Sequence, residues 1–241
     1  MMKKILRWIK NFKKRILSIL KDTTKQFTYV ALGDSTAEGM GASKPERSYA
    51  NIVYASLKER YRLTKYYNFA RSGAILADVV EKQLPKALDA SPDLITISVG
   101  ANDIIRRTKT DEYEKLLRKL LQTLQRQTNA TVVISTVPDL SLAPSVPKLL
   151  RTYSRYMANK LNEIIIKTAE DTNTVVVDIF NDSRALLKIF PEAIASDGWH
   201  PSDFGYALWA NSILVTLRNI IEPPKREKIP QEEEENIQAI K

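Results

Sequence analysis

The chain has 241 residues, enough for one large domain with a sizeable core, and we expect a single domain with tails. It contains no cysteine, which excludes a disulfide framework and any thiolate metal site. A single histidine likewise cannot build a histidine-rich zinc site, so a metal ion would have to bind carboxylates.

The net charge of +9 is concentrated at the N-terminus. Residues 1–26 contain nine Lys or Arg and one Asp, which leaves 28 Lys or Arg and 27 Asp or Glu in the rest of the chain. The body of the protein is therefore close to neutral. A broad basic face for nucleic acid is not indicated, and we expect no nucleic-acid partner.

Residues 1–25 form a basic segment with a strong helical period. Its apolar side chains fall on one arc of a helix while Lys and Arg occupy the other side; they are Ile5, Trp8, Ile9, Phe12, Ile16, Ile19 and Leu20. Lysines and arginines interrupt every apolar run, which excludes both a membrane span and a signal-peptide core. The pattern is typical of a helix that lies in an anionic membrane surface, although packing on the domain or binding a partner would use the same pattern. We therefore expect a cytoplasmic protein with this segment on the inner face of the membrane.

The middle of the chain alternates β-rich runs with amphipathic helical segments. The expected strands are residues 27–33, 65–70, 93–100, 131–137 and 174–180. Five strands alternating with helices predict a parallel sheet covered on both faces, in a domain that spans residues 26–221. The last helix should run from Ser202 to Ile220, with Ser202 or Asp203 as its N-cap. Residues 222–241 are broken by proline and densely charged, which predicts a flexible tail.

The seven glycines mark one edge of this predicted sheet. They lie at a strand end, in the connection after it, or beside the sequence DGWH, and they are Gly33, Gly39, Gly41, Gly73, Gly100, Gly198 and Gly205. Glycine is required where φ is positive or where another group approaches the backbone closely. Because ligands bind beyond the carboxyl ends of parallel strands, this edge is the expected binding site.

The residues at that edge are the parts of a nucleophilic hydrolase. Ser35 follows the first strand at the expected start of a helix, where a hydroxyl and free backbone N–H groups coincide. His200, the only histidine, can act as general base, and Asp197 can accept its Nδ1–H and so direct Nε2 toward the serine. The available donors for an oxyanion are the N–H of Ser35, the N–H of Gly73 and the side-chain amide of Asn102.

Four blocks together resemble the SGNH, or GDSL-type, hydrolase superfamily. These blocks are GDSTAEGMG, NFARSGA, VGANDI and SDGWHPS, and the resemblance covers roughly residues 27–220. It implies a three-layer α/β/α sandwich of the flavodoxin-like kind with a five-stranded parallel sheet. It also implies Ser35 as nucleophile, Gly73 and Asn102 as oxyanion donors, and Asp197 and His200 as orienting acid and base. Thr36 and Ala70 depart from the family pattern at positions that supply no catalytic chemistry.

The expected function is therefore a serine ester hydrolase that needs no cofactor and no metal. The resemblance allows lipid or lysophospholipid esters, thioesters and acetylated sugars as substrates. Carbohydrate O-acetyl esterase and thioesterase stay open as alternatives, as does a membrane-binding module with a vestigial site. The spacing after the first strand excludes both common phosphate-binding glycine patterns, and the chain has no G-x-S-x-G. Trp199 is expected to wedge the histidine loop against the core, and Asp34 and Asp103 to bond backbone groups near the site.

Overall fold

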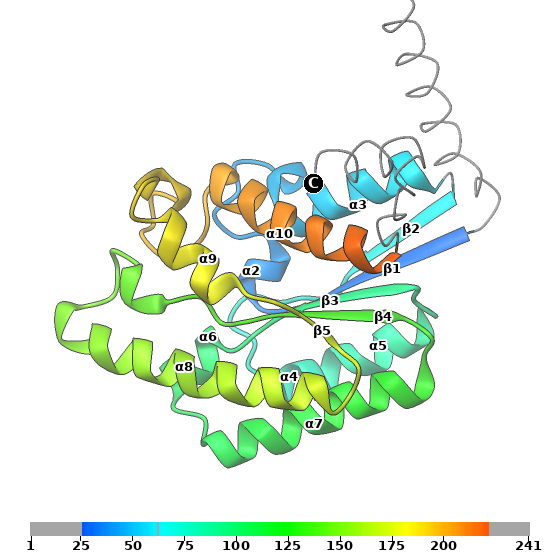
Figure 1. Cartoon of the computed structure of the whole chain (residues 1–241), viewed down its shortest axis with the longest axis horizontal. Coiled ribbons are helices and arrows are strands. Elements are labelled where there is room, and N and C mark those ends of the chain that lie inside the picture. The colour runs from blue at the N-terminus through cyan, green and yellow to red at the C-terminus, as the bar shows by residue number, and fades with distance from the viewer. Residues whose placement is uncertain (1–25, 62, 222–241) are drawn as a thin grey trace, which may run out of the picture.

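The computed structural model describes residues 26–61 and 63–221. They form a three-layer α/β/α sandwich around a parallel sheet of five strands in the order β2-β1-β3-β4-β5 (Figure 1). The strands are β1 Gln26–Gly33, β2 Leu63–Asn68, β3 Leu94–Ser98, β4 Thr131–Ser135 and β5 Val175–Val177. The predicted fold class is confirmed. The predicted basic segment 1–25 and tail 222–241 lie outside the described residues.

Helices cover both faces of the sheet, as Figure 1 shows. One face carries α4 Leu76–Asp78, a π-helical turn Val79–Gln83, α5 Leu84–Asp89, α7 Thr110–Gln127 and α8 Lys148–Glu170. The other face carries α3 Tyr49–Arg60 and α10 Asp203–Ile221. Shorter helices lie at the strand ends: α2 Ser35–Glu38, α6 Ala101–Arg106 and α9 Ile179–Leu186, with 3-10 turns at Pro45–Arg47, Leu140–Leu142 and Pro191–Ala193.

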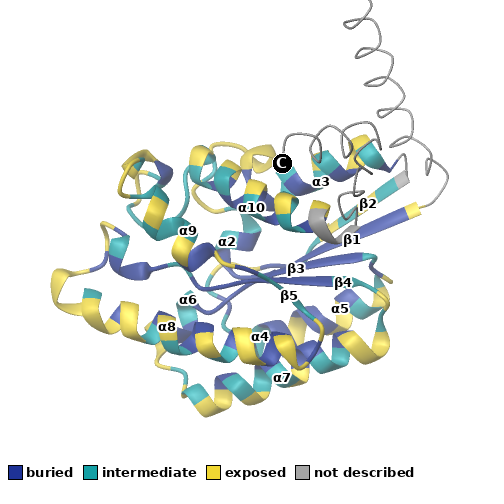
Figure 2. Cartoon of the chain, in the orientation of Figure 1, coloured by how far each residue is buried: buried dark blue, intermediate teal, exposed yellow. Residues whose placement is uncertain are grey.

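The alternation of side chains along each strand divides the core into two clusters. In β1, Val30 and Leu32 belong to the cluster under α7 and α8, whereas Tyr29 and Ala31 belong to the cluster under α3 and α10. The central strands β1, β3 and β4 are almost wholly buried on both faces, as a parallel sheet between helices requires, whereas the edge strand β2 is partly exposed (Figure 2). Helix α7 contributes a stripe at helical spacing, made of Tyr113, Leu117, Leu120, Leu121 and Leu124.

Stacked aromatic rings join the two helices of the second cluster. Tyr49 of α3 stacks on Trp209 of α10 with ring centroids 5.6 Å apart and an interplanar angle of 9°. The indole N–H of Trp209 donates to the hydroxyl of Ser135 at the end of β4, 3.1 Å away. Helix α10 is thereby attached both to α3 and to the sheet.

The last strand is shorter than the apolar run that predicted it. We expected strand through Phe180, but β5 ends at Val177 and α9 begins at Ile179. Asp178 caps this helix, because its side chain accepts the N–H of Asn181. The prediction for Ile179 and Phe180 was therefore wrong: both are buried, but on a helix.

The start of the last helix follows the prediction. Helix α10 begins at Asp203, and the Ser202 hydroxyl accepts the N–H of Gly205 at 3.3 Å. This bond makes Ser202 the N-cap. No helix in residues 26–61 and 63–221 is long and apolar enough to cross a membrane.

Candidate active site

The candidate nucleophile lies where the first strand turns into a very short helix. Gly33 ends β1 with φ of +137°, and a Cβ there would lie 1.9 Å from the Ser98 carbonyl oxygen of β3, so only glycine fits. Asp34 then caps α2 by accepting the N–H of Thr36 at 2.9 Å. Ser35 is consequently the first residue of the helix, where the backbone N–H has no partner within the helix.

The only imidazole of the chain connects the serine to an aspartate. The Nε2 atom of His200 lies 3.0 Å from Oγ of Ser35, and Nδ1 lies 2.6 Å from Oδ2 of Asp197. The structure therefore brings together Ser35, His200 and Asp197, which are 165 and 3 residues apart along the chain. In this arrangement the imidazole can take a proton from the hydroxyl on one side while the carboxylate holds the other nitrogen.

The Asp197 carboxylate is held in its ionised form by the turn that it closes. Partial burial acts to raise its pKa. The hydrogen bond from His200, together with the N–H groups of Trp199 and His200 on Oδ1 at 2.8 and 3.0 Å, outweighs burial and leaves the pKa below its ordinary value. An ionised Asp197 stabilises the imidazolium that forms when His200 accepts a proton.

The loop that carries the histidine is fixed by backbone hydrogen bonds. Ala195 N–H donates to the His200 carbonyl at 2.8 Å, and Ser145 N–H donates to the Gly198 carbonyl at 3.0 Å. The loop after α2 packs directly against it, because a Cβ on Gly41 would lie 2.6 Å from the Pro201 carbonyl oxygen. The nucleophile loop and the base loop are therefore in contact through bare backbone.

Helix α6 holds the loop that carries Gly73. The Asn102 side-chain amide donates to the Ala74 carbonyl at 3.0 Å, and Arg106 donates to the Gly73 carbonyl at 2.9 Å. The Asp103 carboxylate accepts the N–H of Leu76 at 3.1 Å. The three predicted oxyanion donors thus belong to the ends of β1 and β3 and to a loop that α6 fastens beside them. These strands lie on either side of the point where the strand order reverses.

Two buried carboxylates next to the site serve its framework. Burial raises the pKa of Asp34 to about 7 and that of Asp103 to about 6, although hydrogen bonds from the N–H groups of Thr36 and Leu76 act in the opposite direction. Each carboxylate bonds a backbone N–H. The prediction that Asp34 and Asp103 bond backbone groups around the site is confirmed.

Sequence reasoning missed two residues that brace the nucleophile. The buried Gln83 side chain accepts the N–H of Gly33 and donates to its carbonyl, each at 2.8 Å. Glu38, at the end of α2, accepts the N–H of Ser72 at 2.6 Å and so ties the nucleophile helix to the Gly73 loop. Gln83 ends the π-helical turn, directly before Leu84 and Pro85, and a proline cannot donate a helix hydrogen bond. The proline two residues after Gln83 was the only signal, and it does not indicate contact with a strand 50 residues away.

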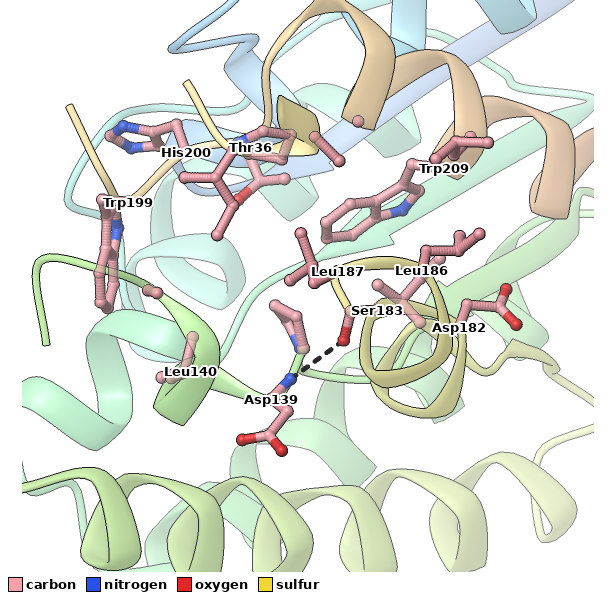
Figure 3. Close-up of a pocket in the computed structure, with 18 of the residues that line it drawn as sticks. Thr36, Asp139, Leu140, Asp182, Ser183, Leu186, Leu187, Trp199, His200 and Trp209 are labelled. Atoms are coloured by element: carbon pink, nitrogen blue, oxygen red, sulfur yellow. Dashed lines mark hydrogen bonds between the residues drawn. The ribbon is translucent and has the colours of Figure 1, made fainter. Parts of the chain in front are cut away.

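An apolar cavity of about 110 Å³ opens beside the site. Thr36, Trp199 and His200 lie at one end of it, and Leu186 and Trp209 at the other (Figure 3). Trp199 packs partly buried against the core under α7 and α8, as the wedge prediction requires, but it also lines this cavity.

Comparisons with known proteins agree with this fold. Residues 31–208 match the model of the GDSL-like Lipase/Acylhydrolase family. A GDSL-like esterase of Mycobacterium tuberculosis is 28% identical over 195 residues, which cover 78% of this chain and 61% of that protein. This chain therefore spans less than two thirds of that relative.

An acetylxylan esterase of Geobacillus stearothermophilus is 27% identical over 205 residues, covering 76% of this chain and 90% of that protein. The crystal structure of the acetylxylan esterase Axe2 from the same organism superposes with a TM-score of 0.65 at 22% identity, over 81% of this chain and 95% of that chain. At this identity the superposition establishes the shared fold.

Proposed function

The chain belongs to the GDSL-like lipase/acylhydrolase family of carboxylic ester hydrolases, and from that premise we propose that it cleaves acyl esters with Ser35, His200 and Asp197 as a catalytic triad. The observation that carries this proposal is the unbroken line of contacts from Ser35 through the imidazole to Asp197, at 3.0 and 2.6 Å. Both distances lie within the range needed for proton transfer and for orienting the base.

Acylation begins when Oγ of Ser35 attacks the ester carbonyl carbon and His200 Nε2 takes the hydroxyl proton. The carbonyl π electrons move to oxygen and give a tetrahedral oxyanion. When that intermediate collapses, the bond to the alcohol oxygen breaks and His200 returns the proton to the leaving alcohol. The product is an ester between the acyl group and Ser35.

The oxyanion needs donors that are already in place before it forms. We assign this role to the N–H of Ser35, the N–H of Gly73 and the side-chain amide of Asn102. The side-chain amide of Asn102 donates one N–H to the Ala74 carbonyl, and this bond fixes the orientation of the amide. The second N–H stays available to the oxyanion. Donors fixed in this way cost little reorganisation when the charge develops.

Deacylation repeats the same chemistry with water. His200 removes a proton from a water molecule that attacks the acyl carbon, and the proton then returns to Oγ of Ser35 as the acid leaves. Every proton in both halves passes through one imidazole. The reaction requires no cofactor.

Two substrate classes follow from different observations. The basic amphipathic pattern of residues 1–25 supports lipid or lysophospholipid esters met at an anionic membrane surface. The acetylxylan esterase relative supports the second candidate, an O-acetyl ester of a carbohydrate. The same triad would also serve a thioester. A membrane-binding module with a vestigial site is the non-enzyme alternative, and the intact contacts of Ser35 and His200 speak against it.

A fluorophosphonate probe tests the proposal, because it phosphonylates only an activated serine. The full-length protein should hydrolyse p-nitrophenyl acyl esters and should carry one adduct, located on Ser35 by peptide mass spectrometry. Ser35→Ala should lose both properties. Ser91→Ala is the matched control, because this exposed serine lies in the connection before β3, at the opposite edge of the sheet. A labelled and active Ser35→Ala protein would overturn the assignment.

A further inference from the structure

The cavity beside the triad is walled by elements that meet only in the folded protein. Its walls come from α9 and α10, from the 3-10 turn at Pro191–Ala193 and from the loop after β4. Leu186, Leu187, Leu208 and Trp209 give the lining its hydrocarbon character. Figure 3 shows Leu187 between Thr36 and the side chains of α9. The cavity therefore begins next to the nucleophile and extends between two helices.

Several polar side chains of the lining are hydrogen-bonded within the protein. The Ser212 hydroxyl donates to Asp182 at 2.6 Å, and the Ser183 hydroxyl donates to the Phe180 carbonyl at 2.9 Å. Trp209 uses its indole N–H on Ser135. With these hydrogen bonds already made, the interior offers a hydrocarbon chain an apolar surface and offers a hydroxyl-rich ligand little in exchange for its hydration.

An ion-pair network supports the wall that the loop after β4 provides. Asp139 has a fully buried side chain, which accepts from Arg155 Nε at 3.0 Å, contacts Arg184 Nε at 3.5 Å and accepts the N–H of Ser141 at 3.1 Å. In Figure 3 its carboxylate points away from the cavity. The arginines come from α8 and α9, so the network links this loop to both helices and maintains the shape of the cavity.

We propose that this cavity binds the acyl chain of the substrate, so that short linear acyl groups longer than acetyl are preferred. The inference rests on the proposed ester hydrolysis. An apolar cavity of 150 Å³ can hold benzene, with six carbons, so about 110 Å³ suits about four carbons beyond the carbonyl. Pentanoyl and hexanoyl esters should therefore fit best.

The acyl chain, rather than the alcohol, is the occupant because of what each half of the reaction requires. The acyl group stays bonded to Ser35 until water releases it, whereas the alcohol must leave and give its place to that water. An apolar cavity suits the acyl group, which stays bound through both halves of the reaction. Water can approach from the side of Asp197, whose side chain is 45% exposed.

The matched variants are Leu187→Trp, which fills the cavity, Leu187→Ala, which enlarges it, and Ile189→Trp as control. Ile189 follows closely in the chain but is 69% exposed and is no part of the lining. Across p-nitrophenyl esters from acetate to decanoate, wild-type kcat/KM should rise about fourfold per methylene up to pentanoate or hexanoate and then fall. Leu187→Trp should shift the optimum toward acetate and Leu187→Ala toward longer chains, while Ile189→Trp should keep the wild-type profile.

A second arm varies the alcohol of acetate esters from ethyl to hexyl, and a third measures binding without catalysis. Hexanamide should bind wild type and Ser35→Ala alike by ligand-observed NMR, should bind Leu187→Trp at least tenfold more weakly, and should bind more tightly than acetamide. The pocket assignment is overturned if Leu187→Trp binds hexanamide as tightly as wild type does. It is also overturned if both Leu187 variants keep the wild-type acyl chain-length profile, or if Leu187→Trp changes the rates across the alcohol series instead. Failure of the proposed hydrolysis has a different signature: no ester is cleaved, yet hexanamide binding still depends on Leu187.

Discussion

Gln83 bonds both backbone polar groups of Gly33 through its side-chain amide, accepting from the N–H and donating to the carbonyl at 2.8 Å each. The carbonyl also accepts the N–H of Arg71 at 3.1 Å. Because β2 ends at Asn68, the Gln83 side chain supplies the partner of the Gly33 N–H, two residues before the nucleophile. The end of β1 is thereby held rigidly although its backbone is about to turn into α2.

Replacing Gln83 with Leu should damage stability and catalysis together. The substitution leaves the N–H of Gly33 without its partner, at a cost of about 1–3 kcal/mol, while the Gly33 carbonyl keeps its bond from the N–H of Arg71. A displaced Ser35 should lower kcat about 10- to 100-fold. Urea unfolding and steady-state kinetics measure both effects, with the exposed Gln127→Leu as control. A Gln83→Leu protein with wild-type kcat would show that the hydrogen bonds from Gln83 to Gly33 do not position Ser35.

Asn102→Ala should lower kcat by about 10²- to 10³-fold with little change in KM, because an oxyanion donor acts mainly in the transition state. The matched control is Arg106→Met, since Arg106 fastens the same loop through the Gly73 carbonyl without being an assigned donor. Its kcat should fall much less. Equal losses in the two variants would mean that Asn102 acts only by holding the loop.

Asp34 should make the stability of the domain depend on pH. Burial raises its pKa to about 7 in the folded state, whereas the unfolded chain restores the ordinary value near 3.8. Between these values the folded protein binds a proton that the unfolded chain does not, so the free energy of unfolding falls as pH rises. The contribution is fully present below about pH 4 and is lost above about pH 7.

Asp34→Asn isolates this effect because the amide cannot ionise but still offers an oxygen to the Thr36 N–H. Relative to wild type, the variant should gain stability as pH rises from about 4 to about 7, measured by urea unfolding at several pH values. Asp111→Asn, at an exposed position in the first turn of α7, should follow the wild-type profile. Parallel curves for wild type and Asp34→Asn would contradict the prediction.

Deleting residues 1–25 should abolish binding to anionic vesicles and spare hydrolysis of a water-soluble ester. The segment holds most of the excess positive charge and contributes no residue to the sheet or to Ser35, His200 and Asp197. Binding of the full chain should weaken as salt screens the attraction. Co-sedimentation with neutral and anionic vesicles at low and high salt measures this. Equal sedimentation of both proteins, or unfolding of the truncated one, would assign the segment to packing or to a partner.

The site residues that could be predicted from sequence are those whose neighbours in the chain already determine their local structure. Ser35 follows a β-rich run and a glycine, and Asp197 and His200 share one turn before a proline, so their positions at strand ends follow from short-range rules. The five strands were recognisable for the same reason. The strand predicted through Ile179 and Phe180 was wrong because a buried apolar run does not distinguish a strand from the start of a helix.

The features that sequence could not predict depend on contacts across the fold. Gln83 reads as one residue of an amphipathic helix, and only the packed structure places its amide on Gly33. The cavity likewise exists only because the fold brings α9, α10 and the histidine loop together around it. Side-chain packing of this kind leaves no periodic signal in the chain.

The most direct test of the triad is a double-mutant cycle on Ser35 and His200. The rates of Ser35→Ala, His200→Ala and the double variant are measured on one p-nitrophenyl ester, with folding checked by circular dichroism. Because both side chains act in one covalent step, each single substitution should remove most of the catalysed rate, and the double variant should be little slower than either. Losses that multiply in the double variant would show that Ser35 and His200 act independently, and would contradict the mechanism.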